Sequence, residues 1–103
     1  MTNPNQDSDL YLTYLHHDKL IRLPVYLVTH MQEALLVLAQ SARPGEPLTL
    51  RQHFGKEDWK AISDGQPVLA GYCMAYLVAK QQVPFEAMGI HPSSKAQMYA
   101  LIG

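Results

Sequence analysis

Histidine and cysteine are the residues of this sequence best suited to hold a metal ion. The chain has one cysteine, Cys73, and five histidines. The histidines are His16, His17, His30, His53 and His91. None stands three or four residues from another histidine or from Cys73, so no local spacing brings together the three or four ligands that zinc requires. The sequence therefore predicts no metal site.

Catalytic patterns are also missing from the sequence. Cys73 stands in an apolar stretch, where a thiol is normally unreactive. Ser93 and Ser94 belong to an expected turn, and Gly65 and Gly71 do not have the spacing of a phosphate-binding loop. We therefore expect neither enzyme activity nor a cofactor.

Basic residues offer a different chemistry, contact with phosphates. The densest group lies between Arg43 and Lys60, with acidic residues interleaved. Arg51, Lys56 and Lys60 would contact a DNA backbone if they shared one face, and otherwise they belong to a neutral, ion-paired surface. The net charge of −1 argues mildly against tight nucleic-acid binding, because domains that depend on phosphate contacts usually carry a basic excess.

Composition points to one small domain with an unusually apolar surface. The chain has 103 residues, of which 17% are charged, against about 25% in an average soluble domain. Such a shortage of charge predicts a partner for apolar surface, most simply a homodimer. Residues 1–9 are polar, unlike a signal peptide, and are expected to form a disordered tail before a single domain at 10–103.

Two features of the sequence bear on location. The longest apolar run, residues 67–79, is shorter than the roughly 20 residues of a membrane span. One unpaired cysteine weakly favours a reducing compartment. We expect a cytoplasmic protein without membrane contact.

The first clear helix is predicted over residues 24–42, where apolar residues recur at spacings of three and four. This helix is apolar around most of its circumference, which is typical of a central helix or of an oligomer interface. The candidate dimer interface consists of Val28, Met31, Leu35, Leu36 and Leu38.

Shorter helices are predicted next. Thr49 and Gln52 match a capping box, which predicts a helix at about 50–54 that Gly55 ends. A second short helix is expected at 56–63. A longer helix is expected at 66–82, with Asp64 as its cap and Pro67 in its first turn.

The ends of the domain show the period of two that is typical of strands. Residues 85–90 and 96–102 alternate around a turn at 91–95, which predicts a C-terminal β-hairpin. Residues 10–17 fit either a strand or a short helix.

This order of elements predicts an α+β fold of the winged helix-turn-helix type, with three to four helices followed by the hairpin. The segment 47–50 would add a short strand to that hairpin. The helix at 66–82 would enter the major groove of DNA and the turn at 91–95 would form the wing. The candidate DNA-binding residues are Arg51, Lys56, Lys60, Gln66, Lys80 and Lys95.

One stretch of the chain resembles a family of small uncharacterised bacterial proteins. The pattern is a tryptophan on a short helix (residues 58–62), then a helix with Leu69 and Gly71, and then a hairpin that ends in a tyrosine, here Tyr99. The resemblance covers roughly residues 48–102 and implies a winged-helix-like fold. It also implies an accessory protein of a plasmid, phage or other mobile element.

A second likeness lies at residues 20–24, where a strand leading into a helix is similar to the opening of ribbon–helix–helix repressors. The helix after this strand is too apolar for the exposed face of that fold.

Two functions remain open at this point. The first is a small DNA-binding or transcription-accessory protein that acts as a dimer. The second is a non-enzymatic protein-interaction module on the same scaffold. The fold favours the first, and the low charge favours the second.

Overall fold

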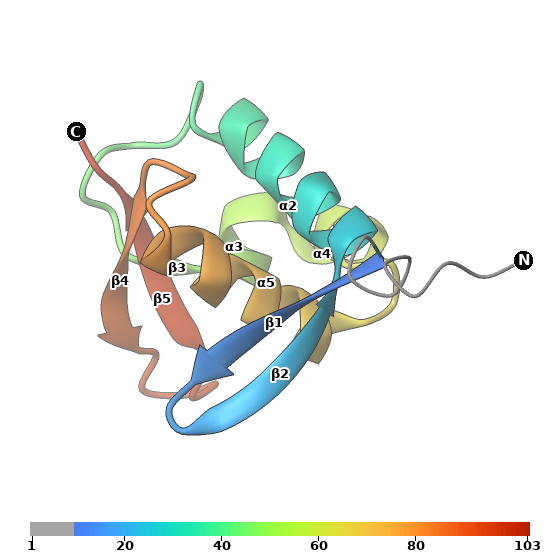
Figure 1. Ribbon diagram of the computed structural model, residues 1–103. Coiled ribbons are helices and arrows are strands. Elements are labelled where there is room, and N and C mark those ends of the chain that lie inside the picture. Colours follow the sequence, from blue (N-terminus) through green and yellow to red (C-terminus); the bar gives the residue numbers. More distant parts are fainter. Residues whose placement is uncertain (1–9) are drawn as a thin grey trace, which may run out of the picture.

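The computed structural model describes residues 10–103, and the tail predicted at 1–9 lies outside the described residues. Within residues 10–103 the fold is α+β, with four helices and two small antiparallel sheets (Figure 1). No helix in this part of the chain is long and apolar enough to cross a membrane.

An N-terminal hairpin opens the fold. It pairs β1 (Tyr11–His16) with β2 (Lys19–Pro24) across a turn of two residues. Both turn residues have positive φ, 47° at His17 and 67° at Asp18, as a type I′ turn requires. Of the two predictions for residues 10–17, the strand is therefore right.

Helix α2 (Val25–Leu38) begins directly after Pro24 and is shorter than the predicted helix at 24–42. Its buried face carries Val28, Met31 and Leu35, which are 6%, 0% and 0% exposed. These three residues belong to the core of a single chain, so their assignment to a dimer interface was wrong. The apolar stripe itself is present, but β2 and α5 cover it from within the same chain.

Two short helices come next, and local sequence accounts for both. In α3 (Leu50–Phe54) the main-chain N–H of Gln52 donates to the Thr49 hydroxyl at 3.2 Å. The Gln52 side chain accepts from the main-chain N–H of Thr49 at 2.9 Å. This confirms the capping box. Gly55, with φ of 87°, ends α3, and α4 (Lys56–Ile62) begins at the next residue.

Helix α5 (Pro67–Ala79) differs from its prediction at both ends. Gln66, rather than Asp64, is the N-cap, and its side chain makes no capping bond. The Asp64 carboxylate instead accepts a hydrogen bond from the Tyr26 hydroxyl at 3.2 Å. The helix ends before residue 82 because the chain turns at Gln81, where φ is 55°.

The C-terminal strands form a three-stranded sheet, in which the segment 47–50 adds the predicted short strand to the hairpin. The strands β4 (Phe85–Ile90) and β5 (Gln97–Leu101) pair antiparallel, and β3 (Leu48–Thr49) pairs with the other edge of β5. The sheet order is therefore β3-β5-β4, with the last strand in the middle. An irregularity between Ala87 and Ile90 breaks the alternation that the sequence predicted for β4.

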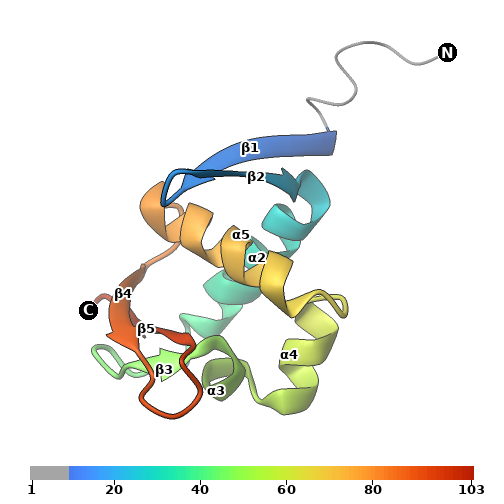
Figure 2. The same ribbon diagram turned by 90° about the horizontal axis from the view of Figure 1, so that it is seen from below.

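One hydrophobic core joins these elements. Figure 2 shows the β1–β2 hairpin on one side of α2 and α5, and the C-terminal sheet with α3 and α4 on the other. Residues from both sheets and from three of the helices contribute buried side chains to this core, among them Leu23, Leu35, Leu77 and Phe85. The hairpin therefore belongs to the same folded unit as the rest of the chain.

Candidate functional site

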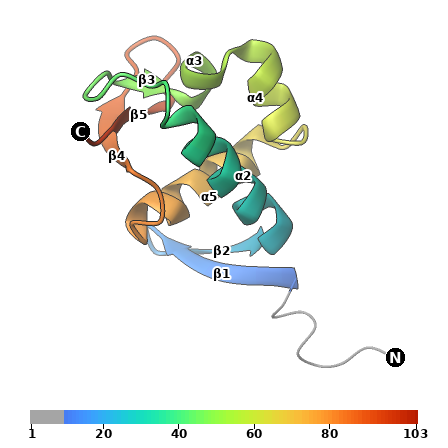
Figure 3. The same cartoon turned by 90° about the horizontal axis from the view of Figure 1, so that it is seen from above.

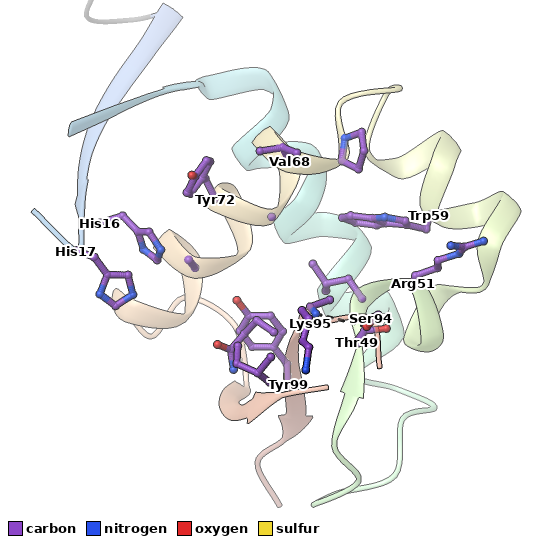
Figure 4. A pocket seen from close by; sticks show the side chains of 17 residues that line it. His16, His17, Thr49, Arg51, Trp59, Val68, Tyr72, Ser94, Lys95 and Tyr99 are labelled. Atoms are coloured by element: carbon purple, nitrogen blue, oxygen red, sulfur yellow. Dashed lines mark hydrogen bonds between the residues drawn. The ribbon is translucent and has the colours of Figure 1, made fainter. Parts of the chain in front are cut away.

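An open groove of about 740 Å³ runs along one side of α5 (Figure 4). Its other borders are the tip of the β1–β2 hairpin, the start of α3, Trp59 of α4 and the β4–β5 loop. Five segments of the chain, from residue 16 to residue 99, therefore meet around it.

The α5 wall is the N-terminal half of that helix. Pro67, Val68, Gly71, Tyr72 and Ala75 line the groove, and their spacing puts them on one helix face. Val68 is 74% exposed, which is high for a valine in a helix. This face presents almost no hydrogen-bonding groups apart from the Tyr72 hydroxyl.

Aromatic rings support two corners of the groove. Trp59 stacks on Phe54 with ring centroids 6.2 Å apart and an interplanar angle of 6°. At the hairpin tip, the His16 ring lies edge-on to Tyr72 at 5.4 Å. These contacts hold Trp59 and His16 against neighbouring elements.

The charged and titratable side chains that line the groove include a basic set from three borders. Arg51 comes from α3, Lys95 from the β4–β5 loop, and His16 and His17 from the hairpin tip. Among the lining residues of the described chain there is no Asp or Glu. Burial, and secondarily the charge of His17, lowers the pKa of His16 below its usual value.

Local hydrogen bonds shape the β4–β5 loop that carries Lys95. The His91 ring accepts from the main-chain N–H groups of Ser93 and Ser94, at 3.1 and 3.2 Å through Nδ1. Gln97 donates to the carbonyl of Gly89 at 2.8 Å. Lys95 itself has a φ of 64°. The loop is thus held in one conformation that brings Lys95 to the groove.

The structure brings together only part of the predicted DNA-binding set. Arg51 and Lys95 both line the groove. Lys56 and Lys60 are exposed on α4 but are not among the lining residues. Of Arg51, Lys56 and Lys60, which would contact a DNA backbone if they shared one face, only Arg51 lines the groove.

The two residues predicted on the long helix are placed elsewhere. The Gln66 side chain donates to the Tyr26 hydroxyl at 2.9 Å, which occupies one of its N–H groups. Lys80 is the C-cap of α5, so it lies about 20 Å from Gln66 at 1.5 Å per helical residue. Neither Gln66 nor Lys80 is among the residues that line the groove.

The histidine pair and Trp59 of the groove were not predicted to line a site. Trp59 is partly exposed at the rim of the groove. The signal for the histidines was the alternation in residues 10–17, because a strand there would place His16 on the face shared by Leu12 and Tyr14.

Among the described residues, neither a cluster of metal ligands nor the cysteine lies at this groove. Across the described residues, no cluster of three or more His, Cys, Asp or Glu is arranged to hold a metal ion. Cys73 is buried in the core, and burial raises its pKa to about 11. At neutral pH the thiol is therefore protonated.

No family model, curated protein or solved structure matches this chain. A function for it therefore has to be inferred from the shape and charge of the groove.

Proposed function

We propose that this chain is a cytoplasmic winged helix-turn-helix domain that binds double-stranded DNA with the groove beside α5. In this proposal α5 is the helix that faces the major groove, and the loop at residues 91–96 is the wing. The order α2, β3, α3–α4, α5, β4, β5 and the sheet order β3-β5-β4 support it.

The observation that carries the proposal is the charge of the groove. Arg51 and Lys95 lie at two borders of a concave surface, two histidines lie at a third, and no carboxylate from the described residues lines it. The net charge of the whole chain is −1, so this local excess of basic groups is not a reflection of overall composition. Such a surface attracts a polyanion, and phosphate contacts supply most of the affinity of non-specific DNA binding.

The side chains on the groove face of α5 indicate how such a complex would recognise the DNA sequence. Arginine, asparagine and glutamine make the usual bidentate contacts to base edges, and none of them lies on the groove face of α5. Val68 and Ala75 offer only apolar contacts, which suit the thymine methyl group. We therefore expect weak sequence preference and a role as an accessory protein.

A salt series with mixed-sequence duplex DNA tests this function. Binding should weaken steeply between about 50 and 200 mM salt. Arg51→Gln and Lys95→Asn should each reduce the slope of log Kd against log salt by about one. Asparagine is chosen at position 95 because it tolerates positive φ.

Lys80→Gln is the matched control, since Lys80 is exposed and lies at the far end of α5. It should leave the salt slope unchanged. Absence of binding at about 50 mM salt, or an equal effect of all three variants, would contradict the proposal.

One observation favours a second candidate, a module that binds an acidic amphipathic helix of another protein. Apolar side chains line much of the groove, among them Trp59, Val68 and Ile90, and the basic residues lie at its borders. An amphipathic helix lays its apolar face into such a groove. Val68→Asp would abolish this binding, whereas DNA binding would lose only the affinity due to one added negative charge.

A further inference from the structure

We propose that the free edge of β1 pairs with β1 of a second copy of this chain, so that two hairpins form one four-stranded antiparallel sheet. This inference concerns the hairpin alone and does not rest on the DNA-binding proposal.

The edge of β1 is open in the described chain. The β1–β2 sheet has two strands, and Figures 2 and 3 place β1 farther than β2 from the helices. An open edge offers unpaired main-chain N–H and C=O groups to another strand. A two-stranded ribbon is also marginal by itself, and more strands stabilise it.

The side chains distinguish the two edges of this small sheet. The β1 sequence, Tyr-Leu-Thr-Tyr-Leu-His, contains no Lys, Arg, Asp, Glu, Pro or Gly. In contrast, β2 carries Lys19, Arg22 and Pro24, and basic residues and proline are common means of blocking an edge. The chain thus protects the edge of β2 and leaves that of β1 free to pair.

The hairpin turn sets the register of this pairing. With a two-residue turn between His16 and Lys19, the main-chain polar groups of Tyr11, Thr13 and Leu15 point to the free edge. An antiparallel pair of identical strands has a two-fold axis, here at Thr13. Thr13 then faces Thr13 of the partner subunit, and Tyr11 faces Leu15 of the partner subunit.

The distribution of charge favours pairing of two copies through β1 over pairing through β2. Strand β1 would contribute no charged side chain to the paired edge, and the Arg22 guanidinium lies 4.5 Å from the ring centroid of Tyr11 in its own chain. Thr–Thr pairs and aromatic–aliphatic pairs are favourable across strands. Pairing through β2 would instead gather the Lys19 and Arg22 side chains of both copies on one small sheet. Such a contact is isologous, as in most homodimers.

This pairing would bury part of the apolar side chains on the outer face of the hairpin. Tyr11, Leu15 and Leu20 are 40%, 61% and 70% exposed there. In the four-stranded sheet, Tyr11 and Leu15 would shield one another across the two-fold axis. Helix α2 also exposes apolar side chains, since Tyr26, Leu36 and Val37 are 55%, 46% and 65% exposed.

Sedimentation velocity over a concentration series, from about 1 to 500 μM, tests the inference together with the variant Thr13→Lys. The unmodified chain should dimerise within this range, and the variant should raise the dissociation constant at least about tenfold, because two ammonium groups would face each other. Thr29→Lys is the matched control: Thr29 is an exposed threonine on α2, and its variant should dimerise normally.

Amide exchange on the unmodified chain provides a second readout that does not depend on any variant folding. The amides of Thr13 and Leu15 should exchange more slowly as the dimer forms. A monomer at the highest concentration of the series would overturn the inference. So would a dimer in which these amides exchange at the monomer rate, or one that Thr13→Lys and Thr29→Lys affect equally.

Discussion

At the scale of single residues, position in the fold decides which chemistry is accessible. Cys73 is enclosed in the core with a raised pKa, whereas His16 lies at the rim of a basic groove with a lowered pKa. The thiol is therefore protonated and unreactive at neutral pH. The imidazole can take up a proton at mildly acidic pH, at the place where an anionic ligand would sit beside it.

Binding of DNA should consequently strengthen as the pH falls. An anion favours the protonated form of His16, and the lowered pKa means that this form appears only below the usual range of histidine. Affinity should rise about two- to fivefold from roughly pH 7 to pH 5.5, the range expected for one partly exposed charge pair. His16→Gln should reduce this rise, as measured by fluorescence anisotropy at fixed salt.

His30→Gln serves as the control for this pH series, because His30 is exposed on α2 and does not line the groove. An unchanged pH dependence in His16→Gln, or an equal loss in His30→Gln, would show that protonation of His16 does not contribute to binding.

At the scale of elements, short-range hydrogen bonds account for the helices that border the groove. Helix α3 has only five residues, too few to be stable without support. The capping box holds its first turn, and the His53 ring, through Nε2, bonds to the carbonyl of Tyr99 on β5 at 2.7 Å. Arg51 is thereby kept in position at the groove.

Removal of the cap should therefore weaken the fold measurably. Thr49→Ala should lower the free energy of unfolding by about 1 kcal/mol, the typical cost of losing an N-cap. Thr49→Ser retains the hydroxyl and should lose less. Urea denaturation followed by circular dichroism measures both, and equal losses would assign the effect to the buried methyl group instead of the cap.

At the scale of the whole molecule, the N-terminal hairpin is part of the common core. Leu23 of β2 is fully buried in the same cluster as Leu77 of α5 and Leu101 of β5. The described chain should therefore unfold as one cooperative unit, as small single domains usually do.

The variant Leu23→Ala tests whether the hairpin and the rest of the fold unfold cooperatively. It should cost about 2–5 kcal/mol, as for other buried leucines, and reduce amide protection in β1–β2 and in β5 together. Leu20→Ala, on the same strand but 70% exposed, should cost far less. Loss of protection confined to the hairpin would show that it opens separately from the rest of the fold.

The sequence by itself determined the elements whose signals are local. Thr49, Gln52 and Gly55 set the bounds of α3 and the start of α4 through bonds and backbone angles within a few residues. The apolar stripe of α2 and the turn between β4 and β5 likewise depend on short-range sequence signals. These features could be predicted because no distant partner is needed to form them.

Tertiary structure decided the rest. Residues 10–17 suit two conformations, and only packing of Leu12 and Tyr14 against the core selects the strand. The stripe of α2 is internal because β2 and α5 cover it. The groove itself joins the N-terminal hairpin, the three helices α3 to α5 and the β4–β5 loop. Which basic side chains meet there depends on long-range packing, and periodicity carries no information about which chain segment covers a given face.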